Sequence, residues 1–491
     1  MKKNYSLKLF LVFAVFFISH QIQAQFTLTG QLRTRTEFRD GQGTLPIRSA
    51  TPSIFTSQRT RLSAGFTSDR FKILTTLQDV RVWGMDGSTI ANMDGNKLFL
   101  HEAWGELFFH DSTWGDHKLS LKIGRQEIMY DDSKLLGNLD WLQQARRHDA
   151  AVLKYLKGTF QIDAGLAFNQ DREKKNAGNL YIGVPLAQMG NDSAAISAAP
   201  GTNAIGRNYK SMQYLYAAKD IGLTKISFLF FKDDFQKLKN PTAAFNSPSN
   251  EIKGVYSRAT TGINIFATLF RKHKIDLSAF YQGNQDKVGK KMSAYMFSIY
   301  PQFSLGRKLT VGPGVDYLSG NNTLNAPDQN NRFDPLYGTP HKFWGFMDYF
   351  YVADGYGLGG NNNLSPGLIN YFIKNKLKVR DNFTVLLDIH EFFAANNVAN
   401  SSTPADLTDK MDVRLGTEID LVLQYAMTKQ INFEAGYGVM FGTPTLKALK
   451  TTNVNSREIG NWAYLMIAIR PDFLFTKPVP PPALPDAIKT K

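Results

Sequence analysis

The sequence predicts an all-β protein: a transmembrane antiparallel β-barrel of about 18 strands, with short periplasmic turns and long extracellular loops. Three observations carry this prediction: an amino-terminal export signal, short segments in which polar and apolar residues alternate, and links that are alternately short and long. Successive side chains of a strand lie on opposite faces, so a period of two indicates strands. Bacterial outer-membrane barrels combine an even strand number with short turns and long loops in alternation.

The composition of the 491-residue chain excludes several other classes. Without cysteine, the chain has no disulfide framework, zinc ribbon, thiol nucleophile or cysteine-bound iron–sulfur cluster. With 43% hydrophobic and 13% aromatic residues, it is not a disordered protein. Its mean hydropathy of -0.27 is too polar for a bundle of membrane helices, each of which needs about 20 mostly apolar residues.

The amino terminus has the pattern of a secretory signal peptide. Lys2 and Lys3 give a positively charged start, and the uncharged apolar run from Leu9 to Ile18 is too short to span a bilayer as a helix. Ala24 is a small residue at the expected cleavage site. We therefore predict a signal peptide over residues 1–24, an outer-membrane β-barrel over 25–473 and a Pro-rich tail over 474–491.

Alternation is clearest near both ends of the predicted barrel. From Thr27 to Arg39 and from Asp412 to Tyr425, polar and charged residues alternate with mostly apolar ones. Short links are expected near Asp69, Gly115, Gly158, Asp220, His273, Gly306, Asp381 and Thr428. Longer links are expected at Gly41–Thr56, Gly84–Lys97, Asp131–Arg147, Gln170–Lys210, Asp233–Glu251, Gly283–Gly289, Gly320–Pro366, Ala394–Lys410 and Gly442–Ser456. This order puts both termini on the short-turn side.

Sequence motifs of common enzymes and metal sites are absent or incomplete. Gly355–Gly360 matches G-x-G-x-x-G, but a dinucleotide site needs a helix after the motif, and three asparagines and a proline follow here. Neither G-x-S-x-G nor H-E-x-x-H occurs. Asp328, Asn330 and Asp334 lack the full spacing of a calcium loop. We expect no catalytic residue, no cofactor and no metal site.

The polar faces of the alternating segments carry the charges that predict a function. In a barrel of about 16–18 strands these faces line a water-filled lumen, and arginines there form a positive conduit for carboxylates. The alternative is that the charges only solvate the lumen and pair with one another. The candidate substrate-binding residues given by this pattern are Arg33, Arg35, Arg59, Arg61, Glu102, Glu106, Arg258, Arg414, Glu418 and Asp420, accompanied by Glu37, Arg39 and Glu434.

One block of the chain resembles the alginate export family of outer-membrane channels. It comprises Gly124-Arg125-Gln126, Lys134-Leu135-Leu136-Gly137-Asn138, Asp140-Trp141 and Arg146-Arg147-His148-Asp149-Ala150, with weaker matches at His101–Trp104 and Leu415–Leu421. The resemblance implies an eighteen-stranded barrel whose arginine-rich lumen passes an anionic polyuronate. It also implies that Arg125, Arg146, Arg147 and Asp149 line the conduit, with Glu418 and Asp420 opposite. Strict alternation from Ile123 aims Arg125 at lipid, so we expect a bulge or the strand end at Arg125.

These observations predict a passive outer-membrane channel, not an enzyme, for an anionic saccharide such as an alginate-like polyuronate or for a small organic anion. The expected partners are outer-membrane lipid, the transported anion and a periplasmic export partner, with no nucleic acid. Two alternatives stay open. One is a non-transporting surface barrel that binds a partner through Gln170–Lys210 and Gly320–Pro366; the other is a phospholipase-type enzyme using His390. Loops folded inward would instead plug or gate the pore.

Overall fold

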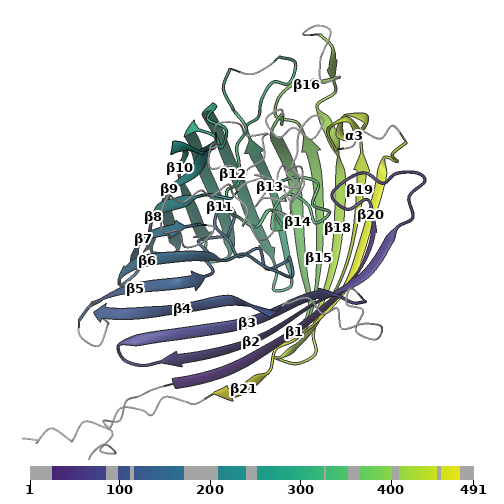
Figure 1. Ribbon diagram of the computed structural model, residues 1–491. Helices are drawn as coiled ribbons and strands as arrows, with labels where there is room; N and C mark the ends of the chain where they lie inside the picture. The colour runs from purple at the N-terminus through teal and green to yellow at the C-terminus, as the bar shows by residue number, and fades with distance from the viewer. Residues whose placement is uncertain are drawn as a thin grey trace, which may run out of the picture.

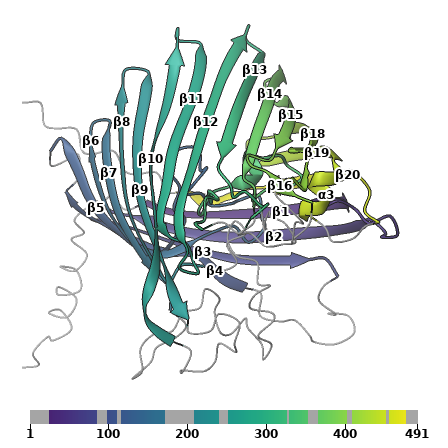
Figure 2. The same ribbon diagram turned by 90° about the horizontal axis from the view of Figure 1, so that it is seen from above.

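The described residues form one closed antiparallel barrel (Figures 1 and 2). The computed structural model describes residues 25–84, 98–110, 115–170, 208–238, 251–325, 328–351, 365–400, 408–450 and 455–475. Each wall strand pairs with the next one along the chain, and the last returns to pair with the first. Within the described residues the wall has eighteen strands when the interrupted last strand, β20 and β21, is counted once, so the predicted fold is confirmed.

The wall strands follow the predicted order of links, although the link at 286–290, predicted among the longer ones, is only five residues long. They are β1 (Gln25–Asp40), β2 (Ser53–Thr67), β3 (Phe71–Val82), β4 (Leu98–His110), β5 (His117–Gln126), β6 (His148–Lys157), β7 (Phe160–Phe168), β8 (Ser211–Ile221), β9 (Thr224–Leu238), β10 (Glu251–Leu269), β11 (His273–Gln285), β12 (Lys291–Leu305), β13 (Leu309–Leu318), β14 (Leu368–Arg380), β15 (Phe383–Phe393), β18 (Arg414–Ala426), β19 (Ile431–Gly442), β20 (Ile459–Ile469) and β21 (Asp472–Phe475). The predicted signal peptide and nearly all of the predicted tail lie outside the described residues, as does Gly355–Gly360.

Three small elements of the described chain belong to the long links. They are a two-stranded hairpin of β16 (Val398–Ala399) and β17 (Lys410–Met411), a 3-10 turn at Pro340–Lys342, and the short helix α3 (Pro444–Lys450). Among the described residues, no helix is long and apolar enough to cross a membrane.

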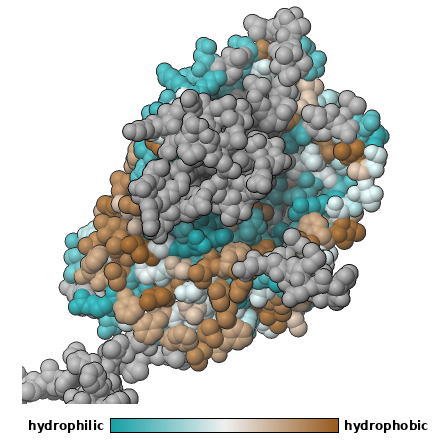
Figure 3. All heavy atoms as spheres, in the orientation of Figure 1, coloured by the Kyte–Doolittle hydropathy of each residue, from teal (hydrophilic) through white to brown (hydrophobic). Residues whose placement is uncertain are grey.

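The wall is apolar outside and polar inside, the reverse of a soluble protein. Ile123, Leu107 and Leu153 are exposed on the outer face, whereas their neighbours in sequence turn toward the lumen. Figure 3 shows hydrophobic residues gathered on the outer wall and hydrophilic residues in the hollow at its centre. Because exposed apolar surface is unfavourable in water, this pattern fits a wall surrounded by lipid.

Two bulges change which way the following side chains point. The β3–β4 register shifts between Thr76 and Leu77, so that His101 is an extra residue on β4. The β15–β18 register shifts between Phe392 and Phe393, so that Leu415 is extra on β18. An extra residue reverses the alternation, because the side-chain period of a strand is two.

The last strand is broken at Pro471, which has no N–H to donate to the ladder. Gly30 of β1 still donates to the Pro471 carbonyl at 2.9 Å. A Cβ at Gly30 would lie 2.7 Å from the ring of Phe473, so glycine makes room for this ring. The barrel then continues to Phe475, two residues beyond the predicted boundary.

Two long links fold into the barrel. We call residues 127–147, between β5 and β6, and the described part of 319–351, between β13 and β14, the luminal loops. They are joined by a parallel bridge at Leu136 and Tyr337 and by hydrogen bonds from Tyr337 N to Leu135 O and from Gly137 N to Tyr337 O. Trp344 and Phe350 are fully buried there. The barrel therefore holds a second, partly aromatic core inside its polar lining.

Candidate substrate conduit

Four of the predicted arginines lie side by side on the lumen face of β1 and β2. Arg33 is paired with Arg59 across the two strands, and Arg35 and Arg61 share their phase. The side chains of Arg33, Arg35 and Arg59 are almost completely buried, because the β5–β6 luminal loop packs on them. Arg35 lies 4.0 Å above the Trp141 ring and donates to the Trp141 carbonyl. These arginines therefore face the lumen, where they hold a loop in place.

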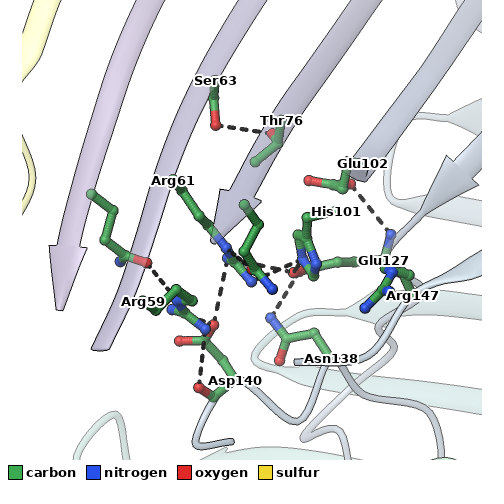
Figure 4. Close-up of polar contacts among 12 residues, drawn as sticks. Arg59, Arg61, Ser63, Thr76, His101, Glu102, Glu127, Asn138, Asp140 and Arg147 are labelled. Carbon is green, nitrogen blue, oxygen red and sulfur yellow. Dashed lines mark hydrogen bonds and ion pairs between the residues drawn. The ribbon is translucent and has the colours of Figure 1, made fainter. Parts of the chain in front are cut away.

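Asp140 of the luminal loop is the shared counter-ion of this cluster (Figure 4). Its carboxylate lies 2.8 Å from Arg59, 3.2 Å from Arg33 and 3.7 Å from Arg61. Arg33 also donates to the Gln143 side chain, and Arg35 is 2.8 Å from the buried Glu37. The positive charge of the cluster is therefore largely balanced by acidic side chains and by hydrogen bonds to amide groups within the protein.

The β4 bulge adds a second set of polar contacts. His101 and Glu102 are consecutive, yet both point toward the lumen. The His101 Nε2 lies 2.7 Å from Glu127 of the luminal loop and 3.0 Å from Arg61 (Figure 4). Glu102 accepts hydrogen bonds from the Trp104 indole and from the Glu127 backbone N–H. Glu102 is thus in the lumen as predicted, and it holds the loop as well.

Arg258 on β10 forms buried ion pairs, so its charge is not exposed to water in the lumen. Its guanidinium contacts Asp233 of β9 and, at 3.2 Å, Asp334 of the β13–β14 luminal loop. The hydroxyl of Tyr337 donates to the same Asp233. Asp334 is therefore occupied by Arg258, which argues against the weak calcium pattern at Asp328–Asp334.

Glu418 and Asp420 face the lumen from β18, and both are buried. The backbone N–H of Met347 donates to Glu418 at 2.8 Å, and that of Phe346 donates to Asp420 at 3.2 Å. A Cβ at Gly345 would lie 2.4 Å from the Glu418 carboxylate, so glycine permits this close approach. The acids predicted to oppose the arginines therefore anchor the other luminal loop.

Arg146 and Arg147 belong to the luminal loop itself. Arg146 is buried and donates to the carbonyls of Gly137 and Gly338, so it joins the two luminal loops. Burial lowers the pKa of Arg146 to about 9, which leaves it charged at neutral pH. Arg147 lies 4.7 Å from the Phe99 ring, and burial lowers its pKa.

Three predicted conduit residues lie on the outer face instead. Arg125 shares the phase of the exposed Ile123, and it forms a bidentate pair with Asp149 at 2.8 and 2.9 Å. The β4–β5 register is continuous there, so Arg125 has no bulge, but β5 ends one residue later. Arg414 pairs with Glu391 at 2.6 Å on the outer face, because the bulge at Leu415 reverses its phase.

Sequence analysis overlooked the lysines of the short-turn half. Lys72 and Lys122 both lie over the ring of the lumen-facing Trp104, at 5.7 and 3.9 Å from its centroid. Glu106, a predicted lumen residue, accepts from Lys154 at 3.2 Å and from Ser120. Four further lysines have the same strand phase as buried lumen residues and therefore face the lumen: Lys225, Lys274, Lys374 and Lys376. The alternating lysines at 374, 376 and 378 were a visible signal of this set.

The alternative functions gain no support from the described residues. His390 points into the lumen, is buried and lies 2.9 Å from the Asn370 amide oxygen, so it does not form a catalytic pair on the lipid-facing surface. The described part of Gly320–Pro366 packs inside the barrel. Most of Gln170–Lys210 lies outside the described residues.

Comparisons with known proteins agree with this architecture. The alginate export family model matches residues 24–172, which span β1 to β7 and include the block that carried the resemblance. The later Leu415–Leu421 strand lies outside this match. A search of curated proteins returned no matching sequence.

Solved structures of outer-membrane porins share the fold. OpdO of Pseudomonas aeruginosa is 10% identical, with a TM-score of 0.54 over 93% of this chain and 99% of that chain. OccK2 (OpdF) of Pseudomonas aeruginosa, in complex with glucuronate, is 11% identical, with a TM-score of 0.52 over 91% of this chain and 97% of that chain. At such identities the likeness shows the fold. The protein is thus a multi-pass β-barrel of the bacterial outer membrane with the porin fold, and its residues 24–172 match the alginate export family.

Proposed function

We propose that the protein is a passive outer-membrane channel that favours anions and takes an anionic saccharide, such as an alginate-like polyuronate, or a small organic anion. The observation that carries this proposal is a set of uncompensated lumen cations. Lys72, Lys274 and Lys376 share the phase of buried lumen residues and have no ion-pair partner among the described residues. A water-filled channel in a low-dielectric wall concentrates the field of such charges.

The comparisons support the substrate class. A polyuronate carries one carboxylate on each sugar, and the match to the alginate export family covers the wall from β1 to β7. OccK2 was solved with glucuronate, which is also a sugar acid. A passive channel has no cofactor, and its direction is set by the gradient or by periplasmic partner proteins.

The test is the reversal potential of the purified protein in a planar bilayer across a salt gradient. Wild type should prefer anions, and the preference should weaken toward 1 M salt, where the Debye length falls to about 3 Å. Changing Lys72→Gln and Lys376→Gln together should reduce the anion preference. Lys157→Gln with Lys219→Gln is the matched control, because both lie on the outer face. A wild-type preference for cations would refute the proposal.

A further inference from the structure

A polar cavity of about 300 Å³ lies in the lumen beneath the β5–β6 luminal loop, on the short-turn side. The lumen faces of β5 to β9 contribute Lys122, Lys154 and Asp163 to it. Tyr130 and Asp131 of the luminal loop close it on the long-loop side. Its volume is at the lower end of the roughly 300–1,000 Å³ of small-molecule sites, which suits one or two sugar rings.

The cavity has a free cationic donor. Lys122 makes no hydrogen bond or ion pair with any residue in the described parts of the chain, and its ammonium lies 3.9 Å from the Trp104 ring. Lys154, on the neighbouring strand, is already paired with Glu106 at 3.2 Å. Lys122 is opposite Val152 in the ladder, so Lys154 is its diagonal neighbour. An anion in the cavity would therefore meet Lys122 first, with Lys154 beside it.

The cavity also has an unused acceptor. Asp163 is 2% exposed and lies directly opposite Lys154 in the β6–β7 ladder. Its Oδ2 accepts from the Tyr130 hydroxyl at 2.8 Å and from the Gln161 amide at 3.0 Å, but its Oδ1 has no donor among the described residues. A buried oxygen without a donor is unfavourable, so a hydroxyl brought by a ligand would be stabilised there.

We propose that this cavity is a binding site for a sugar acid, a carboxylate that also carries several hydroxyls. The carboxylate lies against the Lys122 ammonium, and a hydroxyl donates to Asp163 Oδ1. Neither a simple anion nor a neutral sugar satisfies both groups. The site rests on the proposed function and narrows its substrate class. The ligand is either a free sugar acid or one residue of a polyuronate chain.

The test is titration calorimetry of the full-length barrel in detergent with three probes: glucuronate, glucose and a uronate trisaccharide. Wild type should bind glucuronate but not glucose. Lys122→Met keeps the packing on Trp104 and should weaken glucuronate binding by about tenfold or more, since the charge-assisted contact between the ammonium and the carboxylate is lost. Asp163→Asn keeps an acceptor for Tyr130 and should also weaken it. Lys118→Met, on the same strand but outside the cavity, is the matched control.

Three results would overturn the site: equal binding of glucose, unchanged glucuronate affinity in Lys122→Met, or no binding of either acid. Trisaccharide binding without glucuronate binding, lost in Lys122→Met, would support the site and assign it to a chain residue. The reversal potential separates this inference from the proposed function. An anion-selective wild type that binds no sugar acid refutes the site alone, and a cation-selective wild type that binds glucuronate refutes the channel proposal alone.

Discussion

At the scale of single residues, arginines that follow the same alternating sequence pattern differ in their burial and in their ion-pair partners. Arg258 is 4% exposed between Asp233 and Asp334, whereas the side chain of Arg414 is 44% exposed beside Glu391 on the outer face. Removing one partner of a buried ion pair leaves an uncompensated charge, but an exposed pair contributes little. Burial, rather than residue type, therefore decides what each arginine contributes to stability.

We predict that Arg258→Met lowers the free energy of unfolding by about 3–5 kcal/mol. Arg414→Met, the matched control, should change it by about 1 kcal/mol or less. Reversible urea unfolding of the barrel in detergent, followed by tryptophan fluorescence, measures both. Equal effects of the two substitutions would show that the Asp233–Arg258–Asp334 contacts are unimportant.

Asp140 offers a test of the arginine cluster. Asp140→Asn removes the carboxylate shared by Arg33, Arg59 and Arg61, so the three guanidinium groups lose their common counter-ion. We expect a higher ratio of anion to cation permeability than in wild type, measured by reversal potential at 0.1 M salt. Although Asp140 is 40% exposed, the side chains of Arg33 and Arg59 are 4% and 0% exposed, so the loss of their counter-ion should lower the free energy of unfolding by more than the roughly 1 kcal/mol of an exposed pair. A reduced ratio would contradict this view of the cluster.

At the scale of elements, the alternation of the sequence predicts the strands and their turns, since one lipid-facing and one lumen-facing side impose a period of two. It does not predict the bulges, because one extra residue leaves no periodic signal. Arg414 was therefore assigned to the wrong face, while Arg33 and Arg59, on a continuous ladder, were assigned to the right one. Lys122 is not among the predicted residues, because the prediction rested on arginines and acids.

A substitution at Gly124 tests whether β4 and β5 depend on the close approach of their backbones at this position. It has φ +122°, and an added Cβ would lie 2.3 Å from the Ala103 carbonyl oxygen, a partner in the β4–β5 ladder. We predict that Gly124→Ala lowers the melting temperature and the refolding yield in detergent. Gly105→Ala on β4 should be neutral, because its Cβ would meet nothing closer than 4.0 Å. Melting followed by circular dichroism distinguishes them, and equal melting temperatures would contradict the prediction.

At the scale of the whole molecule, the barrel is filled by its own loops. The sequence located the links at Asp131–Arg147 and Gly320–Pro366 but left open whether they fold inward. That outcome depends on contacts between distant residues, such as Asp140 with Arg59 and Met347 with Glu418, which no local pattern contains. Because of the same contacts, residues that were predicted to bind substrate hold the luminal loops in place.

Shortening a luminal loop should therefore widen the ion path. We predict that replacing residues 132–145 by a short Gly-Ser linker raises the single-channel conductance in a planar bilayer. The same change leaves Arg33, Arg59 and Arg61 without Asp140, so anion preference should also increase. An unchanged conductance would mean that ions already pass beside the luminal loops.

The Pro471 interruption has a mechanical consequence. When a closed barrel is heated, it opens first where neighbouring strands are paired least strongly. Here the pairing between the first and last strands lacks one backbone N–H donor and has a register shift beside Thr29. Backbone amides of Asp472–Phe475 should exchange with deuterium well before those of β10 and β11, which pair continuously with each other and contain no proline. Opening would then start at the short-turn end and continue between β1 and β20. The first and last strands of the chain would therefore separate before other neighbouring strands do.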